Sequence, residues 1–439
     1  MSLLNLFNSK FNENTIKTFS NVYSLVFNQL LRYTINFFLS VWIIRYLGPY
    51  DFGAFNYVQA LAGVFSVISS LGLQMVLLKL IISKKKSNKK YIGTSFYLSL
   101  IAGVFSYFAL IVSIYLINSA DKLLIYLALI NGLTFIFDSF KIFTYTFEAN
   151  VNSAPVAKIS NISLIIVSIC KIVVIYFNLG LFYLSFCFVL DYIITGILFA
   201  LLFSKYHFNL SELKFKMIYA KYLLNRSMPF VLSSLLILTY MKVDQILIKN
   251  LLDNKQLGIF SASIRLVEIF YFIPMVIQST LFPSIFKEIK NPKLFQEKLY
   301  NLYSIFIIIS YIIIFSITLL SGFVIRHLYG LQYIDAKKPL LIFAWTFLFM
   351  SLGVARNIFI YSKGLNKINI YISLVGLFSN LILNYILIPK FGISGSAAAS
   401  LISQFLTSYI SSIFFKELHE NFKIATKALY MPKVNFKYF

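Results

Sequence analysis

Long apolar segments recur along all of this 439-residue sequence, and they constrain its fold more than any other feature. Runs of about 18–25 apolar residues are long enough to cross the ~30 Å hydrocarbon core of a bilayer as helices. Segments such as SLLILTY, which ends at Tyr240, lack the strict alternation of a membrane β-strand. Charged residues make up only 12% of the chain, against about 25% in soluble domains. The sequence therefore predicts an all-α integral membrane protein.

Twelve membrane-spanning helices are predicted from these runs and from the turn-forming residues between them. We expect them at residues 18–44, 54–82, 91–117, 123–150, 156–178, 180–204, 222–249, 257–285, 297–320, 337–361, 367–389 and 392–416. The longest internal connection, Lys205 to Lys221, is polar and basic and leaves six helices on each side. The predicted domains are an N-terminal six-helix bundle at 1–205, a cytoplasmic linker at 206–221, a C-terminal six-helix bundle at 222–416 and a cytoplasmic tail at 417–439.

Lysine and arginine are distributed unevenly between the two sides that these spans define. With the N-terminus inside, the cytoplasmic connections carry about three times as many of them as the opposite connections. The positive-inside rule then predicts that both termini are cytoplasmic, which requires an even number of spans. The same bias accounts for the formal net charge of +24, so we interpret this charge as a topological signal and predict no nucleic-acid binding.

The two halves of the sequence echo each other at one topological position. The connection between the first two predicted helices reads IRYLGPYDFGAFNYV and contains the triplet Gly53-Ala-Phe55. The connection between the seventh and eighth reads IKNLLDNKQLGIFSAS and contains Gly258-Ile-Phe260. Parallel six-helix repeats of this kind are a known plan for transporters, with the substrate bound between the repeats.

Three longer stretches carry a resemblance to a known family. They are RYLGPYDFGAFNYVQAL from Arg45, KVDQILIKNLLDNKQLGIFSASIRLVEIFYFIPMVIQSTLFP from Lys242, and NLILNYILIPKFGISGSAAASLIS from Asn380. In that order, and on twelve predicted spans, they make the chain similar to the Wzx-type O-antigen and polysaccharide flippases. These flippases belong to the multidrug/oligosaccharidyl-lipid/polysaccharide (MOP) exporter superfamily. The resemblance extends from about Thr18 to Lys416.

This resemblance implies a fold, a cargo and a setting. The fold would be a MATE-like, V-shaped pair of six-helix bundles with a central cavity, working by alternating access. The cargo would be a polyprenyl-diphosphate-linked oligosaccharide, such as an O-antigen or capsule unit, moved from the cytoplasmic to the periplasmic leaflet of a bacterial inner membrane. We also expect coupling to H⁺ or Na⁺, as in an antiporter, through the intramembrane carboxylates named below, and no cofactor. A polysaccharide polymerase and a chain-length regulator are the expected protein partners.

Cations inside the predicted spans are the candidate substrate-binding residues. A charge near the bilayer centre costs at least about 2.5 kcal/mol unless it has a partner or faces water, and a lipid diphosphate is an anion that Arg and Lys bind well. The predicted substrate-binding residues are Arg32, Lys141, Lys171, Lys242, Arg265 and Arg356. Internal charge compensation is the alternative, because Arg265 and Glu268 are spaced i, i+3 on one helix face. Asp138 and Lys141 have the same spacing.

Carboxylates inside the spans are the candidates for ion coupling. A carboxylate in a partly dry cavity can take up a proton near neutral pH, and it can also bind Na⁺. The predicted ion-coupling residues are Asp138, Glu148, Asp191, Asp244 and Glu268. A structural role is the alternative for each of them, and Asp244 in particular is placed to lock the seventh helix to a neighbouring span.

No catalytic or metal site is predicted. The three histidines, His207, His327 and His419, show no metal-ligand spacing, and Cys170 and Cys187 lie in apolar spans where core packing is expected. We therefore predict a transporter and not an enzyme. The alternatives are a multidrug exporter of the same superfamily, which an excess of cavity cations disfavours, and a membrane-embedded polysaccharide polymerase or glycosyltransferase, which the short outer connections disfavour.

Overall fold

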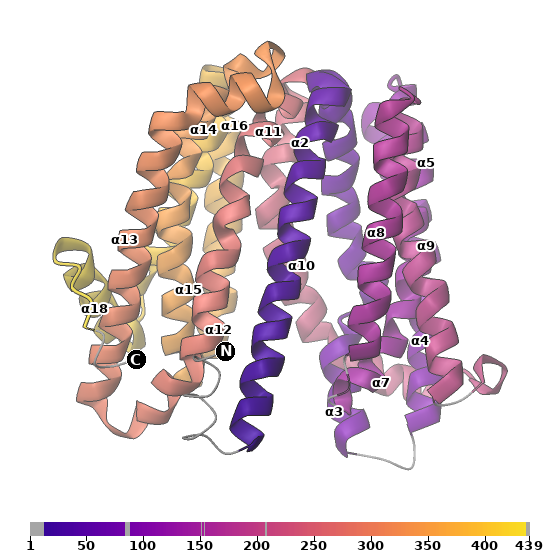
Figure 1. Cartoon of the computed structure of the whole chain (residues 1–439), viewed down its shortest axis with the longest axis horizontal. Helices are drawn as coiled ribbons and strands as arrows, with labels where there is room; N and C mark the ends of the chain where they lie inside the picture. Colours follow the sequence, from indigo (N-terminus) through magenta and orange to yellow (C-terminus); the bar gives the residue numbers. More distant parts are fainter. Residues whose placement is uncertain (1–12, 84–87, 151, 153, 207–208, 436–439) are drawn as a thin grey trace, which may run out of the picture.

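The computed structural model describes residues 13–83, 88–150, 152, 154–206 and 209–435, and these residues form helices without any β-strand (Figure 1). The predicted all-α class is confirmed. A helix satisfies its backbone hydrogen bonds within a single segment, which is what the interior of a bilayer requires of an apolar run.

The N-terminal half begins with one long helix and continues with shorter ones. Its elements are α2 (Glu13–Ser70), α3 (Leu73–Ser83), α4 (Asn88–Asn118), α5 (Lys122–Asn131), α6 (Leu133–Asp138), the 3₁₀ turn η2 (Ser139–Phe143), α7 (Thr144–Ala149), α8 (Ala154–Tyr176), α9 (Leu181–Tyr206) and the 3₁₀ turn η3 (Leu210–Glu212).

The C-terminal half repeats this alternation of long helices and short turns. Its elements are α10 (Met217–Leu251), α11 (Asn254–Glu268), η4 (Ile269–Tyr271), α12 (Phe272–Phe286), η5 (Lys287–Lys290), α13 (Pro292–Val324), the π-helix η6 (Ile325–Tyr329), η7 (Leu331–Ala336), α14 (Lys337–Ala344), α15 (Thr346–Ser362), α16 (Asn366–Phe405), the π-helix η8 (Leu406–Ile410), α17 (Ser411–Phe414), η9 (Lys416–Leu418) and α18 (His419–Tyr430).

Ten helical segments in the described part of the chain are long and apolar enough to cross a membrane. Two of them, Thr34–Ser83 and Lys367–Phe414, contain 50 and 48 residues, which as straight helices would extend about 70–75 Å. A non-helical glycine divides each one, because Gly48 has a φ of 69° and Gly392 a φ of 58°. When α2 is counted from its start at Glu13, each part is long enough to cross the membrane, so the ten segments are consistent with the twelve predicted crossings.

Two of the predicted spans are interrupted by 3₁₀ turns. The span predicted at 257–285 is divided by η4 into α11 and α12. Pro274 explains this break, because it has no N–H to donate to the carbonyl of Phe270 four residues earlier. The span predicted at 123–150 is divided into α5, α6 and α7 by Gly132 and η2. Both interruptions lie beside the charged residues described below.

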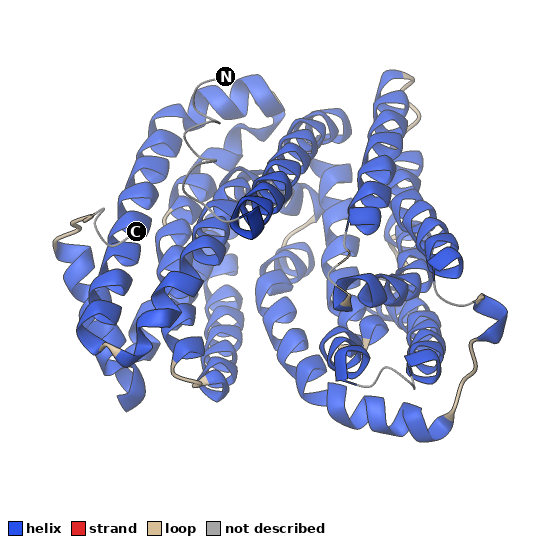
Figure 2. Cartoon of the chain, turned by 60° about the horizontal axis from the view of Figure 1, so that its bottom comes forward, coloured by secondary structure: helices blue, strands red, loops and turns tan. Residues whose placement is uncertain are grey.

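The helices form two groups that lie side by side. Figure 1 shows α3 to α9 in one group and α12 to α18 in the other, with α2 and α10 between them. The two groups are also distinct when the lower end of the molecule is turned toward the viewer (Figure 2). The helix α2 packs against both α10 and α11, so it connects the groups. This arrangement is the V-shaped pair of bundles that we expected.

The groups are joined at the upper end of Figure 1, which we call the joined end (residues 44–58, 248–260 and 325–336). There the backbone of α2 meets the backbone of α11. A methyl group on Gly53 would lie 1.7 Å from the carbonyl oxygen of Asn254, and one on Gly258 would lie 1.8 Å from that of Pro49. Only glycine allows two backbones to approach this closely.

Hydrogen bonds and a shared core reinforce the joined end. The hydroxyl of Tyr333 donates to the carbonyl of Ile44 at 2.9 Å, and the side-chain amide of Gln332 donates to the carbonyl of Arg45 at 3.2 Å. One cluster of buried side chains includes residues from both halves, such as Ile44 and Phe260. The two glycine triplets of the sequence repeat are thus in contact with each other.

At the opposite end, each half has its own core. Phe295 and Phe306 belong to a cluster within the C-terminal half, whereas Leu77 and Phe203 belong to one within the N-terminal half. The N-terminal cluster also includes Leu223, from the first turns of α10. The halves therefore share their main core at the joined end and diverge away from it. The predicted division of the chain at 1–205, 206–221, 222–416 and 417–439 stays a prediction.

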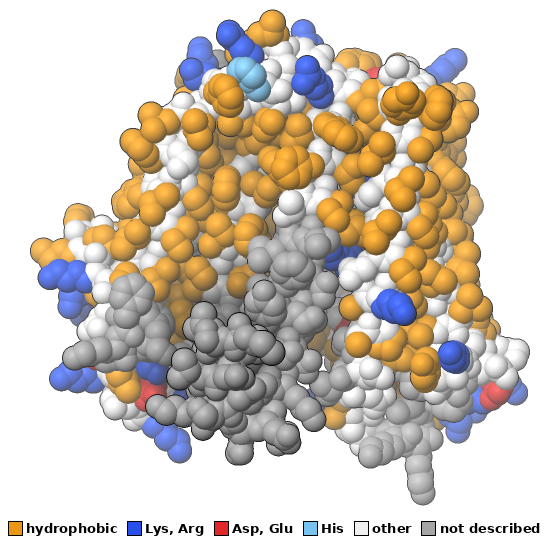
Figure 3. Space-filling view, viewed as in Figure 1, with side chains coloured by type: hydrophobic (Ala, Val, Ile, Leu, Met, Phe, Trp, Pro, Cys, Tyr) orange, Lys and Arg blue, Asp and Glu red, His pale blue; other side chains and the backbone are white. Residues whose placement is uncertain are grey.

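The surface of the molecule has the character of a multi-pass membrane protein. Exposed hydrophobic side chains cover the middle of the molecule, and Lys and Arg gather toward its two ends (Figure 3). Large apolar side chains such as Leu116, Phe315 and Leu319 are between 65% and 75% exposed. An apolar surface of this extent is stable only against lipid.

We predict that Gly258→Ala weakens the joined end. The added methyl group overlaps a backbone oxygen that cannot move aside, and overpacking of this kind costs about 1–3 kcal/mol or more. Pulsed spin-label distances between labels at positions 122 and 337, in a cysteine-free background, should show the halves further apart at this end. Gly63→Ala is the matched control, because a methyl group there meets nothing within 4 Å. An unchanged distance distribution in Gly258→Ala would show that this contact does not hold the halves together.

Candidate functional site

A central cavity of about 320 Å³ lies between the two halves. It is lined by Asn36, Phe37, Leu39, Ser40 and Ile43 of α2, Lys171 of α8, Phe188 of α9, Arg265 and Glu268 of α11, and Ile269 of η4. Two predicted substrate-binding cations therefore meet in this cavity, one from each half of the chain. One predicted ion-coupling carboxylate, Glu268, accompanies them.

Lys171 is half-buried and lies against an aromatic ring. Its ammonium nitrogen is 3.8 Å from the centroid of the Phe188 ring, which is within the range of a cation–π contact. It also interacts electrostatically with Asp191 and with Arg265. No carboxylate of the described residues lies within 4.0 Å of Lys171. The ammonium group is thus held in place without being neutralised by direct contact.

Arg265 and Glu268 form the one ion pair of the central cavity among the described residues. Their closest atoms, Nη1 and Oε2, are 3.9 Å apart, and the arginine side chain is 55% exposed. The predicted charge compensation between them is therefore present, but an ion pair this long and this exposed contributes little to stability. The cavity is lined by two cations, Lys171 and Arg265, and by one carboxylate, Glu268. It therefore carries an excess of one positive charge, which suits an anion.

A second cavity of about 270 Å³, the N-terminal cavity, lies within the N-terminal half. It collects five of the predicted residues, Arg32, Asp138, Lys141, Glu148 and Asp191. The Ser163 hydroxyl donates to Asp191 at 2.5 Å, and the Gln74 amide donates to Glu148 at 3.3 Å.

The charges of the N-terminal cavity are not joined in direct ion pairs. In the part of the chain that the structure describes, neither Asp138 nor Lys141 has an oppositely charged group within 4.0 Å. The 3₁₀ turn η2 begins directly after Asp138 and contains Lys141. Side chains three residues apart have different relative directions in a 3₁₀ turn and in an α-helix, so the i, i+3 spacing does not produce the direct pair that an α-helix would favour.

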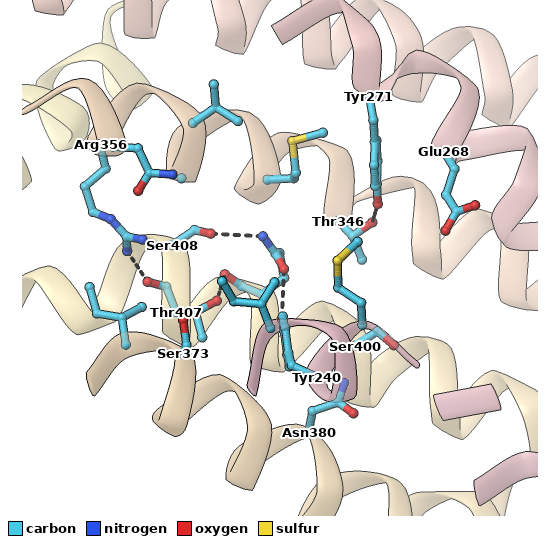
Figure 4. A pocket seen from close by; sticks show the side chains of 18 of the residues that line it. Tyr240, Glu268, Tyr271, Thr346, Arg356, Ser373, Asn380, Ser400, Thr407 and Ser408 are labelled. Atoms are coloured by element: carbon cyan, nitrogen blue, oxygen red, sulfur yellow. Dashed lines mark hydrogen bonds between the residues drawn. The ribbon is translucent and has the colours of Figure 1, made fainter. Parts of the chain in front are cut away.

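A third cavity of about 370 Å³, the C-terminal cavity, lies within the C-terminal half and is shown in Figure 4. Neutral polar side chains are joined across it. The Tyr240 hydroxyl donates to Gln404 at 2.8 Å, and Gln404 donates to Ser408 at 3.1 Å. Glu268 lines this cavity as well as the central one, so the two are adjacent.

Asp244 is buried at the edge of the C-terminal cavity and holds α10 to α16. Its two carboxylate oxygens accept hydrogen bonds from Asn384 at 2.8 Å and from Ser400 at 2.5 Å. Asn384 precedes the break at Gly392 and Ser400 follows it, so Asp244 contacts both arms of α16. These contacts join α10 to α16, which is the structural role that the sequence analysis gave as the alternative for Asp244.

Arg356 is only 6% exposed and is bonded within its own half. Its guanidinium group donates to the carbonyl of Thr407 and to the hydroxyl of Ser411, the latter at 3.2 Å. Thr407 lies in the π-helix η8, whose widened turn makes carbonyls available to side chains. Although Arg356 lines the C-terminal cavity, this geometry favours a structural role for it.

The remaining predicted residues are placed less centrally. Lys242 is half-buried on α10 and lines none of the cavities described here. Nδ1 of His327 lies 2.9 Å from the carbonyl oxygen of Phe323, and Nε2 of His419 lies 2.7 Å from that of Ile413. His207 is outside the described residues. The site assignments made from the sequence stay predictions.

Sequence reasoning missed the neutral members of these cavities. Phe188 is one aromatic residue among 47 phenylalanines, and nothing local distinguishes it. Gln404 and Ser408 are spaced i, i+4 and Thr407 lies beside them, so their shared helix face was a usable signal for the C-terminal cavity.

The fold defines the class of the protein. The structure is similar to an inward-facing multidrug resistance MATE transporter of the MOP superfamily, with a TM-score of 0.69 and 14% identity, covering 90% of this chain and 95% of that one. It is similar to the lipid II flippase MurJ in an inward closed conformation, with a TM-score of 0.69 and 16% identity, covering 92% and 90%. It is also similar to an outward-facing multidrug resistance MATE transporter, with a TM-score of 0.57 and 15% identity, covering 91% of this chain and 93% of that one. The chain has the fold of these solved membrane proteins.

The chain belongs to the polysaccharide biosynthesis protein family, whose model matches residues 42–338, more than half of its length. It is also 25% identical over 418 residues to the capsular polysaccharide biosynthesis protein CapF of Staphylococcus aureus, covering 92% of this chain and 100% of that protein. The family confirms the expected place in polysaccharide biosynthesis, and the fold confirms the expected architecture of a membrane transporter.

We predict that Arg356→Met lowers the stability of the protein more than it lowers substrate binding. The substitution removes the guanidinium donor from the Thr407 carbonyl and from the Ser411 hydroxyl, and a hydrogen bond to a charged group contributes about 1.5–3 kcal/mol. Thermal unfolding of the purified protein should show a lower midpoint, and Lys242→Met, on the same half, should leave the midpoint near that of the wild type. A variant with unchanged stability and lost binding of a lipid diphosphate would assign Arg356 to the substrate site.

Proposed function

We propose that this protein flips a polyprenyl-diphosphate-linked oligosaccharide from the cytoplasmic to the outer leaflet of a bacterial inner membrane by alternating access. One observation carries the proposal: Lys171 and Arg265, from opposite halves of the chain, line one cavity that contains a single carboxylate, Glu268. A diphosphate is the part of such a substrate that needs positive charge within the membrane.

The central cavity can bind a diphosphate through its two cations. The guanidinium group of Arg265 offers paired N–H donors that match phosphate oxygens, and the ammonium group of Lys171 adds a point charge. The long contact between Arg265 and Glu268 leaves the guanidinium group free to exchange its partner. Because the two cations belong to different halves, a bound diphosphate would draw the halves together around it.

The sugars of the substrate can occupy the adjacent C-terminal cavity. Its hydroxyl and amide groups, including those of Tyr240, Gln404 and Ser408, can hydrogen-bond to sugar hydroxyls. Glu268 lies where the two cavities meet. A substrate that places its diphosphate beside Arg265 would therefore extend its sugars past Glu268.

The proposed orientation has both termini in the cytoplasm, in line with the excess of Lys and Arg in the connections on that side. The joined end then faces away from the cytoplasm, and substrate enters from the cytoplasmic end. The CapF relative of a capsule pathway supports a capsule or O-antigen unit as cargo. A polysaccharide polymerase and a chain-length regulator remain the proposed partners.

We further propose that transport is coupled to H⁺ or Na⁺ at Asp244. This carboxylate is 8% exposed and accepts hydrogen bonds from neutral groups. Lys242 acts on it electrostatically, but no cation of the described residues lies within 4.0 Å of it, so a proton or Na⁺ could bind it directly. Binding at Asp244 would act on both arms of α16 at once. Asp138, Glu148 and Asp191 in the N-terminal cavity, and Glu268, are the alternative coupling residues.

A multidrug exporter is the second candidate function, because one structural neighbour is a multidrug transporter. The excess positive charge of the central cavity disfavours it, since a cationic drug would be repelled by Lys171 and Arg265. The experiment below distinguishes the two functions.

We predict that Lys171→Met and Arg265→Met each reduce translocation of a lipid-diphosphate sugar in proteoliposomes by about 10-fold or more. Each removes one charge-assisted hydrogen bond to the substrate, worth about 1.5–3 kcal/mol. Arg265→Lys should restore part of the activity, and Lys242→Met is the matched control because Lys242 lines none of the cavities described here. Normal translocation by the double variant would refute the assignment. Transport of a cationic dye, with no transport of the lipid, would support the exporter.

We predict that Asp244→Asn abolishes the acceleration of translocation by an ion gradient. Asparagine retains a similar shape and one acceptor oxygen, so the contact with α16 should largely remain, whereas the negative charge that attracts an ion is lost. Initial rates measured with and without proton and sodium gradients test this. A variant that still responds to the gradient would move the coupling site to the N-terminal cavity, where Asp191→Asn is the next substitution.

A further inference from the structure

An apolar groove of about 430 Å³ lies on the membrane-facing side of the N-terminal half, apart from the three cavities. This lateral groove is lined by Trp42, Arg45 and Tyr46 of α2, Ile172, Ile175 and Tyr176 of α8, and Asn178 of the following turn. It shares no lining residue with the central, N-terminal or C-terminal cavity. A molecule bound in it would therefore leave the proposed substrate site free.

The groove is built into the packing of α2 on α8. Ile43, Val174, Leu184 and Cys187 form a buried cluster behind it. The backbone N–H of Gly180 donates to the Tyr46 hydroxyl at 2.7 Å, which fixes the turn after α8 against α2. The groove is thus bordered by elements that are held together by packing and by a hydrogen bond, so it does not depend on a bound molecule for its shape.

One cation, Arg45, lies at the end of the groove that is nearest to the lipid headgroups. Arg45 precedes the break of α2 at Gly48, so it lies at the level where a spanning helix leaves the hydrocarbon. It is exposed, and among the described residues no carboxylate lies within 4.0 Å of it. In the described structure its guanidinium group makes only one hydrogen bond, a long one of 3.4 Å to the carbonyl oxygen of His327.

The rest of the groove has the composition of a membrane interface. Trp42 lies one turn deeper than Arg45 and is 53% exposed, and Tyr176 on the facing helix is 77% exposed. Tryptophan and tyrosine concentrate at the boundary between acyl chains and headgroups. A cation above an apolar, aromatic channel complements a molecule with an anionic head and a hydrocarbon tail.

We propose that the lateral groove binds a phospholipid with an anionic headgroup, whose phosphate contacts Arg45 and whose acyl chain lies along Trp42 and Tyr176. A phospholipid, rather than the polyprenyl carrier, is the occupant because the groove opens to the bilayer and has no lining residue in common with the central cavity. A basic side chain near the membrane surface enriches an anionic lipid about fivefold.

Tryptophan fluorescence tests this proposal without any transport measurement. The chain has only two tryptophans, Trp42 and Trp345, so Trp345→Phe leaves Trp42 as the reporter of the groove. The full-length variant is placed in phosphatidylcholine bilayers with a minor fraction of brominated phosphatidylglycerol, or with the same fraction of brominated phosphatidylcholine. Bromine quenches tryptophan at contact distance. We expect brominated phosphatidylglycerol to quench the fluorescence of Trp42 as strongly as brominated phosphatidylcholine does at about five times that fraction.

Three further variants assign the effect to the groove. Arg45→Gln should reduce the enrichment to none, whereas Arg45→Lys should retain most of it. Arg326→Gln removes another exposed cation of the joined end that does not line the groove, and it should leave the enrichment unchanged. The complementary Trp42→Phe variant, which reports from Trp345, should show no preference between the two lipids.

The proposal is overturned by equal quenching from the two brominated lipids in the Trp42 reporter, by a preference that survives in Arg45→Gln, or by one that is lost in Arg326→Gln. Unbrominated polyprenyl phosphate that relieves the quenching at a lower fraction than unbrominated phosphatidylglycerol would identify the carrier as the occupant, and would overturn the phospholipid assignment. Since no translocation is measured, the result does not depend on the proposed function.

Discussion

Where α2 crosses α11, the backbones of Gly53 and Gly258 come so close that a side chain on either one would overlap a carbonyl oxygen of the other helix. The rest of the arrangement depends on this contact, because it brings the two halves into one core at a single end of the molecule. The same two residues occupy equivalent positions in the two repeats. A contact made by residues without side chains also has little to repack when it separates, which is compatible with the alternating access that we propose.

The charges inside the membrane are accommodated in three physically different ways. Arg356 donates through Nη1 to a carbonyl and a hydroxyl of its own half, while its buried Nε has no hydrogen-bond partner in the described part of the chain. Asp244 accepts from an amide and a hydroxyl. Both side chains therefore join neighbouring helices. The charges of the N-terminal cavity face one another across a polar space. Lys171 and Arg265 differ from all of these, because an aromatic ring and a long ion pair leave them available to a ligand. The central cavity is the candidate site because its two cations can still bind a ligand, and not only because they are charged.

Much of the fold was predictable because the requirement for backbone satisfaction in a bilayer is local. Each apolar run has to form its own helix. The break at Gly48 falls between the first two predicted spans, and the break at Gly392 falls on the first residue of the last one. The 3₁₀ turn η2 was not predicted, and it changed the site, because it alters the relative directions of Asp138 and Lys141. Lys242 and Arg356 were predicted substrate-binding residues because they are cations inside spans. That criterion does not show which cavity, carbonyl or hydroxyl a neighbouring helix places beside each of them.

The sequence by itself determined that this chain is helical, crosses the membrane repeatedly, is built from two related halves and carries an excess of intramembrane cations, since hydrophobic length, turn residues and residue type are all properties of neighbouring positions. Only the tertiary structure decided that Lys171 and Arg265, 94 residues apart in the chain, line one cavity while Arg356 is bonded within a bundle. The physical reason is that the environment of a charge is set by the faces of other helices, and these are fixed by packing between distant segments such as α2 and α11.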